Sequence, residues 1–241
     1  MNELIIQDKS FLDARTKEKY RTLRTNIEFC GIENKVIVFT SCAPGDGKST
    51  VSYQLARAMA EAEKKVLLID ADLRRSTLLE RLSVKGNPIG LSHILTGRNE
   101  LRESIYVTNI PRFHMMPTGV FPTNPAELLG KKSFSNMIKA LSDKFHYILI
   151  DAPPIGRVID AAVVASHCDG VVMVVYAQKN SRREERLAVE QMRTANPNIL
   201  GVVLNRVEQS KRIFSNKNHD AYYYYEPSKK EKRKKKKEMR G

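Results

Sequence analysis

The segment 43–50 carries residues suited to holding a phosphate group. It reads Ala-Pro-Gly-Asp-Gly-Lys-Ser-Thr and lies between an apolar run and an amphipathic segment. Glycines let backbone N–H groups approach a phosphate closely, and the positive end of a following helix adds to that attraction. A lysine and a hydroxyl at the end of such a loop reach the β and γ phosphates of ATP and a Mg²⁺ ion, respectively. We therefore predict an ATP-binding loop formed by Pro44, Gly45, Asp46, Gly47, Lys48, Ser49 and Thr50.

This loop departs from the usual G-x4-G-K-[ST] pattern at its first position, where Cys42 replaces glycine. The strand, loop and helix context still favours nucleotide binding over a glycine-rich loop with no ligand.

Two aspartates follow a second apolar run, at residues 66–69. Because strand side chains alternate, Asp70 and Asp72 project to the same side if the strand continues to its end. They would then lie at the carboxyl edge of a sheet, where ligands bind in open α/β folds. Two carboxylates at this edge can hold hydrated Mg²⁺ and accept a proton from an attacking hydroxyl. The alternative is a helix cap and a solvated turn.

A third aspartate, Asp151, ends the apolar run at residues 147–150 and precedes Pro153 and Pro154. An acidic residue at the end of a buried strand is the usual second magnesium-site acid of P-loop proteins. The prolines stop the strand sharply. Asp151 is therefore a candidate magnesium ligand.

Continuous apolar runs, rather than alternating ones, are expected of strands buried on both faces of a parallel sheet. The pattern predicts an α/β fold of the P-loop NTPase type, with a doubly wound, mainly parallel sheet flanked by helices. We expect one domain at residues 1–207 and a flexible tail at 208–241, where apolar periodicity is lost. The predicted strands are 36–39, 66–69, 147–150, 171–175 and 200–204, and the predicted helices are 15–29, 50–62 and 182–195.

Together these motifs resemble those of the bacterial tyrosine kinase family. That family carries Walker A, Walker A′ (D-x-D-x-R) and Walker B (D-x-P-P) motifs, which match the loop at 43–50, Asp70 to Arg74, and Asp151 to Pro154. Glu18, Arg21 and Arg24 look like the family's E-x2-R-x2-R oligomerisation motif, and Tyr222, Tyr223, Tyr224 and Tyr225 look like its C-terminal tyrosine cluster. The resemblance spans about residues 15 to 225; the compact tyrosine block and the lysine-rich end depart from the pattern.

The resemblance implies a non-specific protein-tyrosine kinase that uses ATP and Mg²⁺ and autophosphorylates its tyrosine cluster. The residues that the resemblance implies for catalysis are Lys48, Asp70, Asp72 and Asp151. It also implies that Ser49, Asp72 and Asp151 are magnesium ligands, directly or through water. Asp70 is the expected base, although Asp70 and Asp72 could exchange roles.

It also implies partners: a homo-oligomer, with a ring expected, a membrane-spanning polysaccharide co-polymerase that activates the kinase, and a cognate tyrosine phosphatase. Similar proteins act in capsule or exopolysaccharide production. This chain resembles the split form, which needs a separate membrane activator.

The net charge of +14 favours anionic partners, and residues 226–241 alone contribute +6 of it. The lysine run at 229–237 is either a solubilising tail or a segment attracted to acidic lipid. Nucleic-acid binding is a third option for this segment, and it is disfavoured because no aromatic stacking platform is present beyond the tyrosine block. With no apolar run of about 18 residues and no signal-like N-terminus, we expect a cytoplasmic protein recruited to the inner face of the cell membrane.

Two other functions remain open from the sequence. The first is a partitioning or septum-placement ATPase that dimerises on ATP and binds membrane or DNA. Its loop carries a signature lysine, K-G-G-x-G-K-[ST], and the matching position here is Ala43, followed by Pro44. The second is a nucleotide-dependent scaffold without catalysis.

Overall fold

A central eight-stranded sheet organises the part of the chain that the computed structural model describes, which is residues 2–7, 12–177, 179, 181–196 and 198–207. The strand order is β1-β4-β5-β3-β6-β2-β7-β8, and neighbours are parallel except for β4 and β5. The strands are β1 (Asn2–Leu4), β2 (Val36–Ser41), β3 (Val66–Asp70), β4 (Tyr106–Thr108), β5 (Phe113–Met116), β6 (Tyr147–Asp151), β7 (Gly170–Tyr176) and β8 (Ile199–Asn205).

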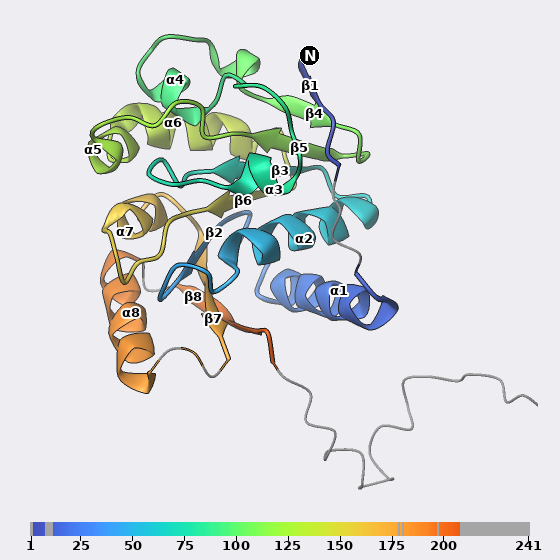
Figure 1. Cartoon of the computed structure of the whole chain (residues 1–241), viewed down its shortest axis with the longest axis vertical. Helices are drawn as coiled ribbons and strands as arrows, with labels where there is room; N and C mark the ends of the chain where they lie inside the picture. Colours follow the sequence, from blue (N-terminus) through green and yellow to red (C-terminus); the bar gives the residue numbers. More distant parts are fainter. Residues whose placement is uncertain (1, 8–11, 178, 180, 197, 208–241) are drawn as a thin grey trace, which may run out of the picture. The chain divides into compact units, whose positions relative to one another are not determined.

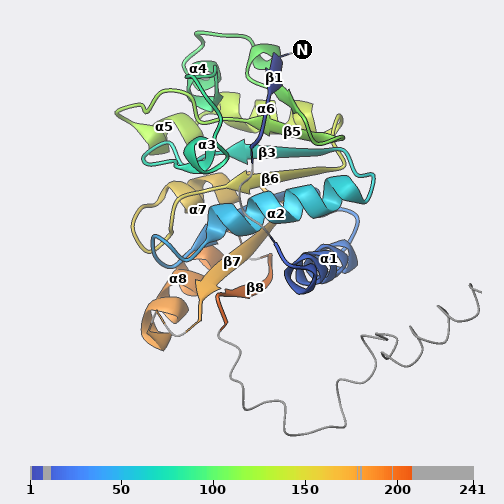
Figure 2. The same cartoon turned by 45° about the vertical axis from the view of Figure 1, so that its right-hand side comes forward.

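Helices cover both faces of this sheet, as Figures 1 and 2 show. Helices α1 to α3 pack on one face, and α4 to α8 pack on the other. The helices are α1 (Ala14–Phe29), α2 (Lys48–Glu61), α3 (Leu78–Arg81), α4 (Leu91–Leu95), α5 (Pro125–Leu129), α6 (Lys132–Ser142), α7 (Asp160–Ala165) and α8 (Arg182–Ala195), with a short 3-10 turn at Leu101–Glu103. The predicted doubly wound, mainly parallel fold is confirmed.

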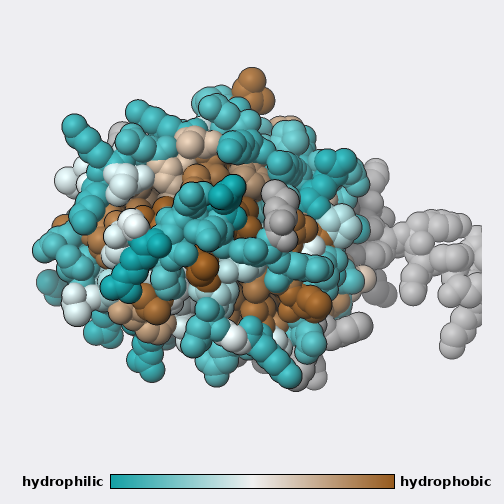
Figure 3. All heavy atoms as spheres, turned by 90° about the horizontal axis from the view of Figure 1, so that it is seen from above, coloured by the Kyte–Doolittle hydropathy of each residue, from teal (hydrophilic) through white to brown (hydrophobic). Residues whose placement is uncertain are grey.

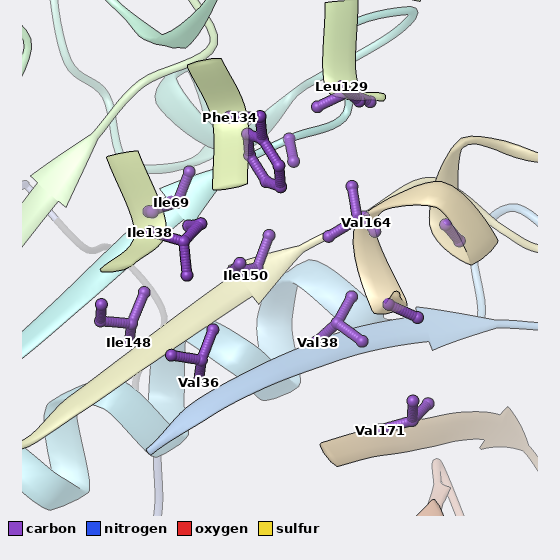
Figure 4. Close-up of a cluster of buried hydrophobic side chains, with 14 of the residues drawn as sticks. Val36, Val38, Ile69, Leu129, Phe134, Ile138, Ile148, Ile150, Val164 and Val171 are labelled. Atoms are coloured by element: carbon purple, nitrogen blue, oxygen red, sulfur yellow. The ribbon is translucent and has the colours of Figure 1, made fainter. Parts of the chain in front are cut away.

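Alternate residues of each central strand enter two separate apolar cores. In β2, Val36 and Val38 face the core beneath α5 to α8, whereas Ile37 and Phe39 face α1 and α2. Figure 4 shows Val36 and Val38 beside Ile148 and Ile150 of β6, with Phe134 and Ile138 of α6 above the sheet. Burial on both faces explains why these strands read as continuous apolar runs in the sequence.

All five predicted strands and all three predicted helices are present, with ends shifted by one or two residues at most. The sequence did not predict β1, β4 and β5, which form the sheet edge beside β3. These strands are only three or four residues long. Polar residues such as Thr108 and His114 interrupt their apolar pattern, so pairing with neighbours decides their conformation.

Helix α1 lies against α2 through one apolar side. Its N-cap is Asp13, whose carboxylate accepts a hydrogen bond from the Thr16 amide at 2.7 Å. Ile27 is buried, and Tyr20 and Leu23, three and four residues apart along the same side of the helix, pack against the same core. This packing leaves the opposite, charged side of α1 exposed.

The face of the molecule drawn in Figure 3 is covered mainly by hydrophilic side chains, with hydrophobic residues scattered between them. No helix in the described ranges is long and apolar enough to cross a membrane.

Candidate active site

The phosphate-binding loop joins β2 to α2 at the carboxyl end of a central strand. Gly45 and Gly47 have φ angles of +83° and +96°, a region that side chains with a Cβ rarely adopt. A Cβ at Gly47 would also overlap the side-chain amide nitrogen of Asn205. Both glycines are therefore needed for this loop to form.

Cys42 does not disturb the loop, although it departs from the motif. Its φ is not positive, and its side chain is buried in the core under α5 to α8. Burial raises the pKa of the Cys42 thiol to about 11, so the thiol stays protonated near neutral pH. A glycine is thus not required at this position.

Lys48 brings the three motifs together. Its Nζ lies 3.1 Å from Asp72 Oδ2, 3.3 Å from Asp151 Oδ1 and 3.3 Å from Ser49 Oγ. Burial acts to lower the pKa of Lys48, but the charges of Asp151, Asp72 and Asp70 outweigh it and raise that pKa. Lys48 is therefore a partly buried ammonium that stays charged near neutral pH, at the start of α2.

The register of the sheet explains how aspartates far apart in sequence reach one lysine. Strands β3 and β6 are neighbours, and Asp70 is paired directly with Asp151. Strand β2, which leads into the loop, lies on the other side of β6. The ends of three adjacent parallel strands therefore converge on Lys48.

Asp70 lies deeper than Asp72. It is 1% exposed, and its carboxylate accepts hydrogen bonds from the Ser76 hydroxyl and, at 3.2 Å, from the Asp72 amide. Burial and the nearby Asp151 charge raise the pKa of Asp70 to about 7. Burial also raises the pKa of Asp151, against the opposing charge of Lys48.

A cleft of about 510 Å³ opens above these residues. Of the predicted site residues, Pro44, Gly45, Gly47, Lys48, Ser49 and Asp72 line it, whereas Asp70 and Asp151 lie beneath. Asp46 is buried, and Thr50 is exposed on α2, where its hydroxyl accepts a hydrogen bond from Arg81 at 3.2 Å. The remaining lining residues are Arg74, Arg75, Ser76, Thr77, Arg81, Pro153, Pro154, Arg157 and Val158.

An ion pair beside the cleft was not predicted from the sequence. Arg74 donates two hydrogen bonds, of 2.8 and 3.0 Å, to the fully buried carboxylate of Asp160 at the start of α7. This pair joins the segment after β3 to the segment after β6, on either side of the cleft. Arg74 is the last residue of the D-x-D-x-R motif. No local sequence pattern indicated a role for its partner Asp160, or for Ser76, which donates a hydrogen bond to Asp70.

The oligomerisation residues predicted on α1 lie apart from the cleft lining. Glu18 and Arg21 are exposed and form an ion pair of 3.2 Å. Arg24 is half-buried, and its Nη1 donates to the Ala58 carbonyl of α2 at 3.2 Å. Arg24 thus belongs partly to the α1–α2 contact. The predicted phosphoacceptors, Tyr222 to Tyr225, lie outside the described residues, as does the tail predicted from residue 208.

The oxygen-rich site around Lys48 fits a magnesium ion. In the described part of the chain no three His, Cys, Asp or Glu side chains form a metal cluster. However, the Lys48 ammonium lies among oxygens of Ser49, Asp72 and Asp151, the predicted magnesium ligands. Carboxylates and hydroxyls are the ligands Mg²⁺ prefers, and in nucleotide sites it takes its other ligands from phosphate and water.

The fold and the loop define a P-loop nucleotide-binding protein, and comparisons with known proteins agree. Residues 34–199 match the family described as an AAA domain. The tyrosine-protein kinase CpsD of Streptococcus agalactiae is 43% identical over 211 residues, covering 87% of this chain and 92% of that protein.

The chain is also similar to solved structures of bacterial tyrosine kinases. The chimerical protein CapA2B2 matches with a TM-score of 0.76 and 34% identity, covering 84% of this chain and 88% of that one. The kinase domain of the Escherichia coli tyrosine kinase ETK matches with a TM-score of 0.74 and 32% identity, covering 81% and 78%. The chain belongs to the bacterial tyrosine kinase family.

The likeness to partitioning-type ATPases is weaker. The septum site-determining protein MinD of Pyrococcus horikoshii, solved with Mg-ADP, matches with a TM-score of 0.63 and 28% identity, covering 74% of this chain and 72% of that one. The two groups share the P-loop fold.

Proposed function

We propose that this tyrosine kinase transfers the γ-phosphoryl group of ATP to Tyr222–Tyr225 of a neighbouring copy of the chain. The observation that carries the proposal is the convergence of Lys48, Ser49, Asp72 and Asp151 at the mouth of the phosphate-binding loop.

In this mechanism the loop amides and the start of α2 bind the phosphates, and Lys48 turns from the aspartates toward the transferring group. Ser49, Asp72 and Asp151 would hold Mg²⁺ directly or through water, and the bound ion would supply positive charge beside the phosphate oxygens. The tyrosine oxygen forms a bond to the γ-phosphorus while the bond to ADP breaks. Asp70 accepts the phenolic proton, with Asp72, which lines the cleft, as the alternative base.

The position of the acceptors in the sequence supports transfer between chains. Strand β8 ends at Asn205, and Tyr222 lies 17 positions further along the sequence. A tethered acceptor reaches a neighbouring site at high effective concentration without a dedicated pocket. Each added phosphate brings a charge of about −1.5 to −2. Four would offset much of the basic tail, loosen the assembly and weaken its attraction to acidic lipid.

Mixing two inactive variants tests transfer between chains. One carries Lys48→Met and retains its tyrosines; the other retains Lys48 and has Tyr222 to Tyr225 changed to Phe. Each alone should give no tail phosphotyrosine, whereas the mixture should label the Lys48→Met chain, read by mass spectrometry. The control mixes each variant with wild type. An unlabelled mixture beside an active wild-type control would instead mean that each chain modifies its own tail or an external substrate.

Assembly into a homo-oligomer, with a ring expected, is proposed to use the exposed charged side of α1. Changing Glu18, Arg21 and Arg24 together to Ala should lower the mass measured by light scattering, because the reciprocal charged face is lost. Since Arg24 also donates to the Ala58 carbonyl, the Glu18→Ala, Arg21→Ala double variant separates assembly from α1–α2 packing.

A matched control for this experiment is Lys19→Ala, which removes an exposed charge from the same helix. Equal mass for wild type and triple variant, at concentrations where wild type is oligomeric, would refute this use of α1.

The cellular role proposed is regulation of capsule or exopolysaccharide synthesis or export with a membrane-spanning co-polymerase activator. The family resemblance supports this role. A cognate tyrosine phosphatase would reverse the modification, and the lysines at 229–237 would assist recruitment to the inner face of the membrane through acidic lipid. The partitioning-type ATPase is disfavoured because Ala43 and Pro44 replace the signature lysine and glycine of its loop.

A further inference from the structure

A buried acidic side chain lies inside the loop that must hold a polyphosphate. The Asp46 side chain is fully buried, and its Oδ2 accepts a hydrogen bond from the Ala43 amide at 2.9 Å. A buried carboxylate is costly unless it is paired. It would also repel the phosphates if its charge were left uncompensated.

The compensating charge comes from the segment between β7 and α8. Lys179 Nζ lies 3.2 Å from Asp46 Oδ1 and donates a 2.7 Å hydrogen bond to the Pro44 carbonyl. Its ammonium also lies 5.6 Å from the centre of the Tyr176 ring. One lysine, more than 130 positions along the chain, thus contacts two residues of the phosphate-binding loop.

A second long-range hydrogen bond holds the same turn of the loop. Asn205, at the end of β8, donates through Nδ2 to the Asp46 carbonyl at 2.9 Å. Asp46 is thereby bound through its side chain by the segment after β7 and through its main chain by the last residue of β8. Neither segment belongs to the three sequence motifs.

We propose that Lys179 is a positioning residue for nucleotide binding: it neutralises Asp46 and holds the Pro44 carbonyl, so that the loop keeps its phosphate-binding shape. Lys179 is not among the residues that line the cleft. Its action is therefore on the loop and not on the reacting atoms. This inference depends on the proposed nucleotide site.

The test is a double-variant cycle on Mg-ADP affinity, measured by calorimetry. Lys179→Met should weaken binding about tenfold, because the buried Asp46 carboxylate loses its ion pair with Lys179 and the Pro44 carbonyl loses its donor. In an Asp46→Asn background the same change should cost no more than about twofold, since a neutral amide needs no counter-ion and can still accept from Ala43. Equal losses in both backgrounds would mean that Lys179 does not act through the Asp46 carboxylate, and would overturn the proposal.

Further measurements separate positioning from general damage to the fold. Lys179→Arg keeps the charge and the donors and should retain affinity within about threefold. The KM for ATP of Lys179→Met should rise about tenfold, with kcat changed by less than about twofold. Lys139→Met, which removes an exposed lysine of α6, is the matched control and should alter neither value.

Two outcomes distinguish failure of this inference from failure of the site. Normal Mg-ADP binding by Lys179→Met, with binding lost in Lys48→Met, would overturn the positioning role alone. Normal binding by both variants would overturn the nucleotide site and the inference together.

Discussion

Replacing Lys48 by methionine is expected to lower tyrosine phosphorylation by at least about 100- to 1,000-fold. The Lys48 ammonium lies within 3.4 Å of Ser49, Asp72 and Asp151, at the point where the phosphates of ATP enter the loop. Methionine has a similar length and no charge, so it removes the stabilisation of the transferring phosphoryl group without enlarging the cleft. The measurement is phosphotyrosine formed per chain over time with ATP and Mg²⁺.

The fold should survive this change, which circular dichroism and a cooperative thermal unfolding curve can check. A lower unfolding temperature is expected, because Asp72 and Asp151 lose a partly buried counter-ion. Lys139→Met controls for loss of one positive charge on the surface. Wild-type phosphorylation by a folded Lys48→Met variant would remove the basis for the proposed active site.

Replacing Asp70 by asparagine is expected to slow transfer by about 100- to 10,000-fold while changing Mg-ATP affinity by less than about threefold. A general base acts mainly in the transition state, so its loss affects kcat more than binding. Asparagine keeps the shape of the side chain and can still accept from the Asp72 amide. The two quantities are read by a single-turnover transfer assay and by calorimetry.

The companion variant Asp72→Asn discriminates between the two aspartates. Asp72 lines the cleft and is bonded to Lys48, whereas Asp70 is buried behind Ser76. Asp72→Asn should therefore weaken Mg-ATP binding and raise the magnesium concentration needed for half-maximal activity. If instead Asp70→Asn reduces binding and transfer in parallel and Asp72→Asn reduces transfer alone, the two roles are exchanged and Asp72 is the base.

The sequence by itself determined the central strands and the chemistry at their ends. Strands buried on both faces must be apolar throughout, so β2, β3, β6 and β7 are visible as continuous runs. The phosphate-binding loop is visible for a similar local reason: Gly45 and Gly47 need backbone angles that other residues rarely adopt. The motifs at the ends of β2, β3 and β6 are local in sequence, so they indicate the family without any knowledge of tertiary contacts.

Tertiary structure alone decided the contacts between segments distant in sequence. The pairing of β3 with β6 brings Asp70 beside Asp151, and nothing local to either strand specifies its neighbour. The partners of Arg74 and Asp46, which are Asp160 and Lys179, lie 86 and 133 positions away along the chain. A single charged residue has no periodicity, so its partner is fixed only when the sheet sets the strand order. Likewise, the E-x2-R-x2-R pattern grouped Arg24 with Glu18 and Arg21, whereas the packing of α1 on α2 directs the Arg24 side chain to the Ala58 carbonyl.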